Sequence, residues 1–477
     1  MDPSRLDQYR SLLSDELFRR ILELMEEPAP PAVRLNPLKL DPKTAIDKLS
    51  NRYGWVVEAV PFCPMGWVLD AFDTSPGQTL EYRDGHYYIQ EASSMLPVEA
   101  FHFDRHQPEL ILDMAAAPGG KSTHLAARSG DRGLLVANDT SRRRLRALAS
   151  NLRTWGAVSS LVTHLPGEEL GSWLPGVFDK VLLDAPCSGE GLREGGGSKG
   201  RQVSDRERGA LQSQQIGMLQ SGLEALKPGG ELVYATCTAA PEENEAVIQA
   251  LLDARLGQVK LESIEALEHQ PGFEGLKGFN DQVFDPSLAL AGRLWPHHFN
   301  TGAFFTARLT KLEASQADHP EPLEAVPPQE LSARERKKIQ DQLLSFGFDL
   351  NRVCQESEWV LITWGRFVKA ISSIWLEMLP GLPVKEAGLP VGRWQGDVFL
   401  PAHEWVTRFY DSFSGRRFTL DPAQAERWQQ GSDLRNASPP ASSGAVLLQD
   451  EAGRFLGVGS VSAQRVRNLL PRSWVVG

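Results

Sequence analysis

The sequence predicts an α/β protein with a Rossmann-like central sheet, a small α+β domain before it and a β-rich domain after it. Three observations lead to this prediction. Short apolar runs alternate with helical segments from Pro108 onward, acidic residues stand where several of these runs end, and a proline-rich acidic stretch precedes the last third of the chain. A chain of 477 residues is also long enough for roughly two to four domains.

Composition divides the chain into four parts. Residues 1–105 begin with an amphipathic helix over 2–27 and continue with short strands separated by turns, which indicates a small mixed domain. Residues 106–312 hold the alternating strands and helices and form the domain that is expected to carry the ligand site. Residues 313–330 carry four prolines and five acids without a lysine or arginine, which is typical of a linker. Residues 331–477 are a C-terminal extension rich in strands.

Composition also limits the class of protein. No apolar run approaches the ~18–20 residues that a membrane span needs, and the N-terminal stretch lacks the apolar region of a signal peptide. We therefore expect a soluble, cytoplasmic protein with no membrane partner; the oligomeric state stays open, with a monomer favoured. The net charge of −11 opposes nucleic acid binding, but the linker holds nearly half of the acidic excess and residues 454–477 carry four arginines and no acid.

The four cysteines are widely spaced, which argues against a disulfide framework and against a zinc site with Cys-x-x-Cys spacing. We expect Cys63 and Cys354 to be buried structural residues. The adjacent His297 and His298 lack a second pair of ligands, so no metal site is expected. Arg34, Asn36 and Lys39 lie on one short stretch that either contacts phosphate or, more in keeping with its charge, forms a solvated face.

The first strand and the loop after it form the predicted cofactor site. The apolar run ends at Asp113, and small residues continue to a helix that begins near Lys121, so a ligand can lie against backbone amides at the helix N-terminus. Asp139 ends the second strand, where an acid suits a bidentate grip on ribose hydroxyls. With Asp113, Lys121, Asp139 and Asp184, the predicted cofactor-binding residues are Ala115, Ala116, Ala117, Pro118, Gly119 and Gly120.

Two later strands each end next to a cysteine. The apolar residues 181–183 stop at Asp184, and a tight loop then places Cys187 just past the strand. A second strand over 232–235 is followed by Thr236 and Cys237. Because the carboxyl ends of parallel strands meet at one edge of a sheet, both thiols and the Asp184 carboxylate are expected to face one crevice.

Two nucleotide-binding functions compete for this pattern. Gly119, Gly120, Lys121 and Ser122 nearly form a P-loop, and residues 180–184 resemble the acidic strand that holds magnesium in ATPases. However, Ala115 stands where that motif needs glycine. A dinucleotide oxidoreductase fits less well, because the first turn lacks Gly-x-Gly-x-x-Gly. Neither function explains why two cysteines follow the ends of two strands.

Methyl transfer to carbon 5 of cytosine does explain two cysteines. A thiolate that adds to carbon 6 makes carbon 5 nucleophilic enough to attack the methyl group of S-adenosylmethionine. Cys237 suits the attacking role, because it precedes a helix expected to begin near Pro241, whose positive end favours a thiolate. Asp184 is expected to hydrogen-bond the ring at nitrogen 3 and the amino group. Release of the enzyme is a role that fits Cys187, and the base must leave its stack to be reached.

The segments DMAAAPGGKS, LLDAPCSGEG and YATCT resemble, in this order and spacing, the Nop/Sun family of RNA cytosine-5 methyltransferases over roughly residues 85–312. The stretches VRLNPLK and IQEASSMLP are similar to the family's amino-terminal segment. The resemblance implies Cys237 as nucleophile, Cys187 as the residue that assists release, and S-adenosylmethionine contacts from residues 115–121, Asp139 and Asp184. The residues after 330 resemble the PUA-like extension of Fmu/YebU-type members, which implies small-subunit (16S) ribosomal RNA as substrate.

The chain departs from the family pattern in two places. Pro166 stands where relatives have an acid that contacts the adenine, and Glu168 or a backbone amide is the expected substitute. A glycine-rich insert, residues 195–200, follows Cys187.

Other functions remain open at this stage. Transfer RNA is an alternative substrate. A DNA cytosine-5 methyltransferase would instead use Cys187 as nucleophile, and a ribosome-assembly factor could keep the fold without catalysis.

Overall fold

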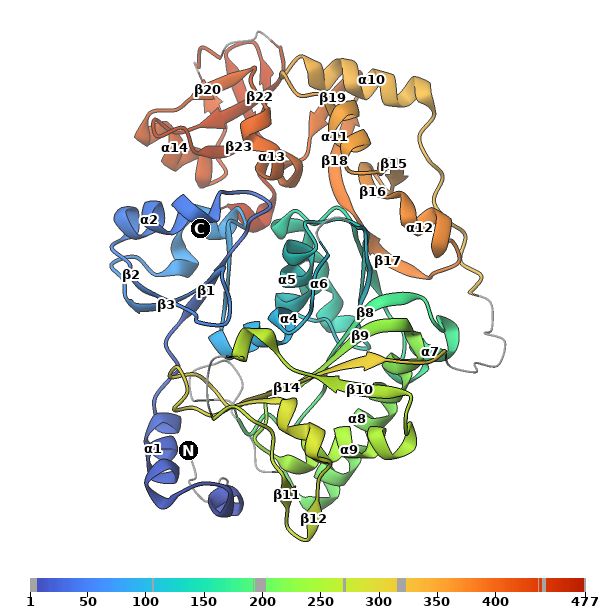
Figure 1. Cartoon of the computed structure of the whole chain (residues 1–477). Coiled ribbons are helices and arrows are strands. Elements are labelled where there is room, and N and C mark those ends of the chain that lie inside the picture. The colour runs from blue at the N-terminus through green and yellow to red at the C-terminus, as the bar shows by residue number, and fades with distance from the viewer. Residues whose placement is uncertain are drawn as a thin grey trace.

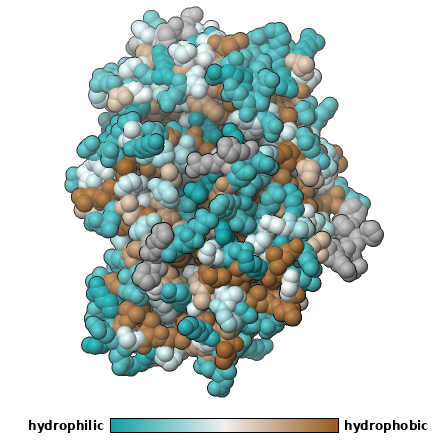
Figure 2. Space-filling model, viewed as in Figure 1, coloured by the Kyte–Doolittle hydropathy of each residue, from teal (hydrophilic) through white to brown (hydrophobic). Residues whose placement is uncertain are grey.

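The computed structural model describes residues 7–104, 107–191, 193, 203–268, 272–314, 323–435, 437–439 and 443–475. Figure 1 shows an N-terminal unit beside a central sheet with helices on both faces, and the C-terminal part of the chain above both. The predicted α/β class is thus confirmed. In the space-filling view, hydrophilic residues dominate the upper, C-terminal part, and hydrophobic residues gather in patches lower down (Figure 2).

The N-terminal helix differs from the prediction. A 3₁₀ helix, η2 (Asp7–Leu12), and the α-helix α1 (Asp15–Glu26) stand where one continuous helix over 2–27 was expected, and residues 2–6 lie outside the described part. The break occurs because Ser14 adopts an extended conformation and its side chain accepts a hydrogen bond from the Leu17 amide, which caps α1.

A four-stranded antiparallel sheet in the order β2-β3-β1-β4 follows, covered by α2 (Pro42–Tyr53). Its strands are β1 (Ala32–Leu35), β2 (Val56–Ala59), β3 (Gly66–Ala71) and β4 (Tyr87–Gln90). The short helices α3 (Leu80–Arg83) and α4 (Leu96–Glu99) stand on either side of β4 in the chain.

The central sheet has the strand order β10-β14-β9-β8-β5-β6-β7-β17. The parallel strands are β5 (Leu110–Asp113), β6 (Leu134–Asn138), β7 (Ser160–Thr163), β8 (Phe178–Asp184) and β9 (Leu226–Thr236). From β5 the chain winds outward through β6 and β7, then returns to the other side of β5 with β8 and β9. The boundary between β5 and β8 is therefore the topological switch point, where open α/β sheets bind ligands.

An antiparallel hairpin extends the sheet on the β9 side. β13 (Gly292–Leu294) pairs with β14 (Phe304–Lys311), which runs antiparallel between β9 and β10 (Val259–Glu262). A second, small hairpin is formed by β11 (Gly278–Phe279) and β12 (Gln282–Val283).

Alternation along the strands divides the core into two layers. In β5, Ile111 packs with Leu125 of α5 (Gly120–Arg128) and Leu148 of α6 (Arg142–Trp155), while Leu112 packs on the opposite face. That opposite face is covered by α7 (Leu170–Trp173), α8 (Asp205–Ala225) and α9 (Glu245–Ala254). Both faces are buried, so each parallel strand contains a run of apolar residues and ends at a polar residue.

The C-terminal part adds a strand to the catalytic sheet, which the sequence did not predict. β17 (Val384–Ala387) pairs antiparallel with the edge strand β7. The other strands of this part form two sheets. The first has four strands: β15 (Trp359–Trp364), β16 (Phe367–Ser372), β18 (Leu389–Gln395) and β19 (Val398–Pro401). The second has five strands: β20 (Arg417–Thr419), β21 (Leu434–Arg435), β22 (Ser443–Gln449), β23 (Phe455–Ser462) and β24 (Arg465–Asn468).

The helices of this part are α10 (Ala333–Leu344), α11 (Leu350–Glu356), α12 (Ser373–Met378), α13 (His403–Phe409) and α14 (Pro422–Gln429). Across the described ranges of the chain, no helix combines the length and the apolar character needed to cross a membrane.

Candidate active site

A cavity of about 240 Å³ lies at the switch point between β5 and β8. Eight of the ten predicted cofactor-binding residues line it. They are Asp113, Ala115, Ala116, Ala117, Pro118, Gly120, Lys121 and Asp184. The small side chains leave the backbone of the loop before α5 exposed to a ligand, as the sequence predicted.

Two cavity-lining side chains have buried polar atoms without a protein partner. Asp113 Oδ1 accepts no hydrogen bond, although Oδ2 of the same carboxylate accepts one from Ser122 Oγ at 2.6 Å. Gln90 Nε2 donates none. Burial raises the pKa of Asp113 to about 7. An unpartnered acceptor and an unpartnered donor on two lining side chains suit a polar ligand that carries both donor and acceptor groups.

Asp139 and Gly119 lie behind this wall of the cavity. The Asp139 carboxylate accepts hydrogen bonds from the amides of Ala117 (3.1 Å) and Ser141 (2.8 Å) and is 3% exposed, so it holds the loop in shape. Gly119 has a φ of 113° at the N-cap of α5, a conformation that favours glycine. Near Pro166, the exposed Glu168 accepts a hydrogen bond from Gln214 at 3.2 Å and is not among the residues that line the cavity.

The N-terminal unit supplies one wall of the cavity, which the sequence analysis missed. The lining residues from this unit are Tyr88, Ile89, Gln90 and Ser94. The stretch IQEASSMLP was noted only as a resemblance, because nothing in a local pattern shows that β4 faces the loop before α5.

The interpretation of Arg34, Asn36 and Lys39 as a solvated or phosphate-contacting face is wrong. Arg34 and Asn36 are fully buried. Lys39 Nζ donates to the carbonyls of Asp84 and Thr154 at 2.6 and 2.7 Å. These side chains join the N-terminal unit to the central sheet domain, because their donors satisfy carbonyl groups at helix ends and turns.

The two predicted cysteines meet at the carboxyl edge of the sheet. Cys187 Sγ and Cys237 Sγ are 3.3 Å apart. The chain can bring these loops together because Gly191 has no side chain. A Cβ at this position would lie 2.7 Å from the Ala303 carbonyl oxygen and 2.8 Å from that of Cys237.

The environment of the pair distinguishes the two thiols. The hydrogen bond shared with Cys237 raises the pKa of Cys187 well above its ordinary value, and burial and the Glu243 carboxylate act in the same direction. Two neighbouring sulfur atoms cannot both ionise cheaply. Cys187 is therefore the thiol of the pair that is held in its protonated form, and its sulfur lies within hydrogen-bond distance of the Cys237 sulfur.

The Lys121 ammonium group interacts electrostatically with the Cys237 side chain. Lys121 Nζ lies 2.7 Å from Asp184 Oδ2, and the Cys237 sulfur contributes to its electrostatic environment. Burial opposes the charge on Lys121, but the Asp184 carboxylate outweighs it and the pKa of Lys121 is raised. The lysine thus links the cofactor cavity to the thiol pair.

Cys63, Glu99 and His124 form a buried cluster that the sequence did not reveal, with potential ligand atoms within 4.8 Å of one another. His124 Nε2 lies 2.9 Å from Glu99 Oε1, and Arg128 Nη1 lies 3.4 Å from Glu99 Oε2. The carboxylate already has these partners, and the nearby guanidinium group opposes a further cation. Cys63 and Cys354 are both buried, as expected.

The chain is similar to known methyltransferases over most of its length. Residues 100–310 match the family described as "16S rRNA methyltransferase RsmB/F", and residues 3–92 match the N-terminal domain of 16S rRNA methyltransferase RsmF. The "Ribosomal RNA small subunit methyltransferase F" of Aeromonas salmonicida is 33% identical over 93% of this chain and 90% of its own length. The chain belongs to this family. The expected S-adenosylmethionine-dependent RNA cytosine-5 methyltransferase is thereby confirmed, and the ATPase, oxidoreductase and DNA methyltransferase alternatives lose their support.

Other matches extend this result. The protein of the same name from Erwinia tasmaniensis is 32% identical over 99% of this chain and 96% of its own length. A crystal structure of a methyltransferase homolog from Pyrococcus horikoshii is 34% identical, with a TM-score of 0.56 over 65% of this chain and 100% of that chain. Residues 417–467 match the C-terminal domain of the pseudouridine synthase TruB, which confirms the PUA-like extension.

Proposed function

We propose that this enzyme methylates cytosine carbon 5 in small-subunit ribosomal RNA through a covalent bond to Cys237. The names of the relatives and the description of the matching family support this substrate. The thiol pair supports the covalent mechanism, because a separation of 3.3 Å lets one sulfur attack the base while the other assists its departure.

The cofactor is held by the loop before α5, by Asp113 and by Gln90; both side chains line the cavity and each has one buried polar atom without a protein partner. S-adenosylmethionine supplies an electrophilic methyl group at this edge of the sheet. Asp184 serves both sides of the reaction, since its carboxylate lines the cavity and is paired to the lysine beside the thiols.

The Cys237 thiolate adds to carbon 6 of the flipped cytosine, and carbon 5 gains nucleophilic character. Asp184 accepts a hydrogen bond from the ring amino group and stabilises the adduct. After carbon 5 has gained its methyl group, it loses its proton to water, the electron pair forms the 5,6 double bond, and the carbon–sulfur bond breaks. The Cys187 thiol donates a hydrogen bond to the departing sulfur, which lowers the cost of expelling a thiolate.

Single cysteine variants test these roles. Cys237→Ala should form no covalent protein–RNA complex and transfer no methyl group. Cys187→Ala should transfer one methyl group and remain attached to the RNA as a band of reduced mobility on a denaturing gel. Transfer of tritium from labelled S-adenosylmethionine, compared between transcribed small-subunit ribosomal RNA and transfer RNA, tests the substrate. An active Cys237→Ala enzyme, or preference for transfer RNA, would contradict the proposal.

A further inference from the structure

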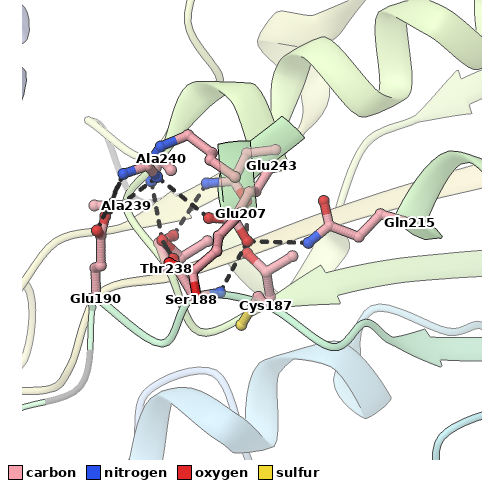
Figure 3. Close-up of polar contacts among 12 residues, drawn as sticks. Cys187, Ser188, Glu190, Glu207, Gln215, Thr238, Ala239, Ala240 and Glu243 are labelled. Atoms are coloured by element: carbon pink, nitrogen blue, oxygen red, sulfur yellow. Dashed lines mark hydrogen bonds and ion pairs between the residues drawn. The ribbon is translucent and has the colours of Figure 1, made fainter. Parts of the chain in front are cut away.

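The loop that carries Cys187 is held by two buried side chains from other elements. Gln215 of α8 and Glu243 of the 3₁₀ helix η6 (Pro241–Glu243) are both fully buried. Gln215 Nε2 donates to the Pro186 carbonyl at 2.9 Å, and Glu243 Oε2 accepts from the Ser188 amide at 2.9 Å. Gln215 thus holds the residue before Cys187, and Glu243 holds the amide of the residue after it (Figure 3). The Ser188 hydroxyl also donates to Thr238 Oγ1 at 2.9 Å.

The two side chains also support each other. Gln215 Nε2 donates to Glu243 Oε2 at 3.0 Å, and Arg208 Nη1 lies 3.3 Å from Glu243 Oε1. Arg208 in turn pairs with Glu190 at 3.1 Å, and Glu190 accepts a hydrogen bond from Tyr9 at 2.9 Å. A buried carboxylate is tolerated only when it is paired in this way. The network therefore fixes the orientation of Glu243 and extends to the N-terminal helix η2.

The loop that carries Cys237 has its own supports. Thr236 Oγ1 donates to Asn244 Oδ1, and Asn244 Nδ2 donates to the Thr238 carbonyl at 3.0 Å. Asn244 thus holds the residues on both sides of Cys237, whereas Gln215 and Glu243 hold backbone groups on both sides of Cys187. The Ser188–Thr238 hydrogen bond joins the two loops directly. Loss of the Gln215 and Glu243 contacts should move one thiol relative to the other.

We propose that Gln215 and Glu243 are positioning residues for Cys187 and are needed to release the methylated RNA. This inference rests on the proposed role of Cys187. The thiol must lie within hydrogen-bond reach of the departing Cys237 sulfur, and the observed separation is 3.3 Å. A displacement of about 1 Å can lower a rate by about 10²-fold. Neither side chain is expected to take part in the addition step.

Two substitutions test the proposal with little change in volume. Glu243→Gln removes the charge and leaves one oxygen in place of two, so its NH₂ group must face either Arg208 or the Ser188 amide and Gln215. Gln215→Met removes the donor to Pro186 and keeps the chain length. Because either variant can lose stability, circular dichroism and thermal unfolding are measured first, and a folded Gln215→Met protein decides the question if Glu243→Gln does not fold.

The assay uses transcribed small-subunit ribosomal RNA with S-adenosylmethionine, and it measures multiple turnover and the gel-stable adduct in parallel. We expect turnover to fall by about 10²-fold, the adduct to accumulate, and the first methyl transfer to keep nearly its wild-type rate. A merely structural defect would lower adduct formation and turnover together. The matched control is Gln214→Met, an exposed neighbour on α8, which should behave as wild type.

Three results would overturn the proposal. Wild-type turnover in both folded variants would show that the contacts do not matter. Loss of turnover without adduct would show that they act on the addition step. If Cys187→Ala itself forms no adduct, the proposed role of Cys187 fails, and this inference fails with it. If Cys187→Ala is trapped on the RNA but the variants at positions 215 and 243 form no adduct, only this inference is refuted.

Discussion

Replacing Arg34 by methionine tests how the N-terminal unit supports the cofactor cavity. The buried guanidinium donates to Gln90 Oε1 (2.7 Å), the Gly120 carbonyl (2.9 Å) and Thr123 Oγ1 (2.7 Å). Gln90 and Gly120 line the cavity. Arg34 also lies 4.9 Å from the centre of the Trp155 ring. One side chain therefore holds the first turn of α5 against β4.

The loss of unfolding free energy expected for Arg34→Met follows from these three hydrogen bonds. A hydrogen bond from a charged donor contributes about 1.5–3 kcal/mol, and an acceptor left buried without a partner adds a cost of about 1–3 kcal/mol. Burial lowers the pKa of Arg34 to about 10, which shows that the charged group is itself unfavourably desolvated and offsets part of this loss. We expect Arg34→Met to lower the free energy of unfolding by about 3 kcal/mol and to weaken S-adenosylmethionine binding by about tenfold.

Denaturant unfolding gives the change in stability, and isothermal titration calorimetry gives the cofactor affinity. Arg20→Met is the matched control, because the Arg20 side chain is 61% exposed and its ion pair with Glu23 lies on the surface. The control should stay within about 0.5 kcal/mol of wild type. Arg34→Met values equally close to wild type in both assays would refute the reasoning.

Two further predictions concern pH and packing. Burial lowers the pKa of His124 from 6.5 to about 4, so the unfolded chain gains a proton first and stability falls as pH drops from 6.5 to 4. In His124→Gln, the free energy of unfolding measured by denaturant titration should fall by about 3 kcal/mol less between pH 6.5 and pH 4 than it does in the wild type. An unchanged pH dependence would contradict this prediction. Gly191→Ala should lower turnover by about tenfold or more, since the added methyl group meets the carbonyls of Ala303 and Cys237. Gly209→Ala, in open space on α8, is its control and should remain fully active; equal activity of the two variants would show that the close approach is unimportant.

The sequence predicted the part of the site that lies at strand ends. Asp113, Asp184 and Cys237 follow apolar runs, and the parallel arrangement of those runs is enough to bring their carboxyl ends to one edge. The cavity and the thiol pair confirm this placement.

The features that the sequence did not predict depend on contacts between segments that are distant in the chain. The local sequence predicts a surface position for Arg34. The side chain is buried because it donates to the Gly120 carbonyl of α5, which lies 86 residues away in the sequence. β17 lies in a stretch broken by glycine and proline, and it forms a strand only because the edge of β7 is available for pairing. Gln215 and Glu243 carry no local pattern, and their role follows from burial beside the Cys187 loop.

The most direct test of the covalent mechanism uses RNA that contains 5-fluorocytidine at the target position. Fluorine at carbon 5 cannot leave as a proton does, so the adduct persists, and digestion followed by mass spectrometry identifies the attached residue. The account predicts a nucleotide on the peptide that contains Cys237, with Cys187 unmodified. A nucleotide on Cys187, or no adduct in an enzyme that methylates ordinary RNA, would contradict it.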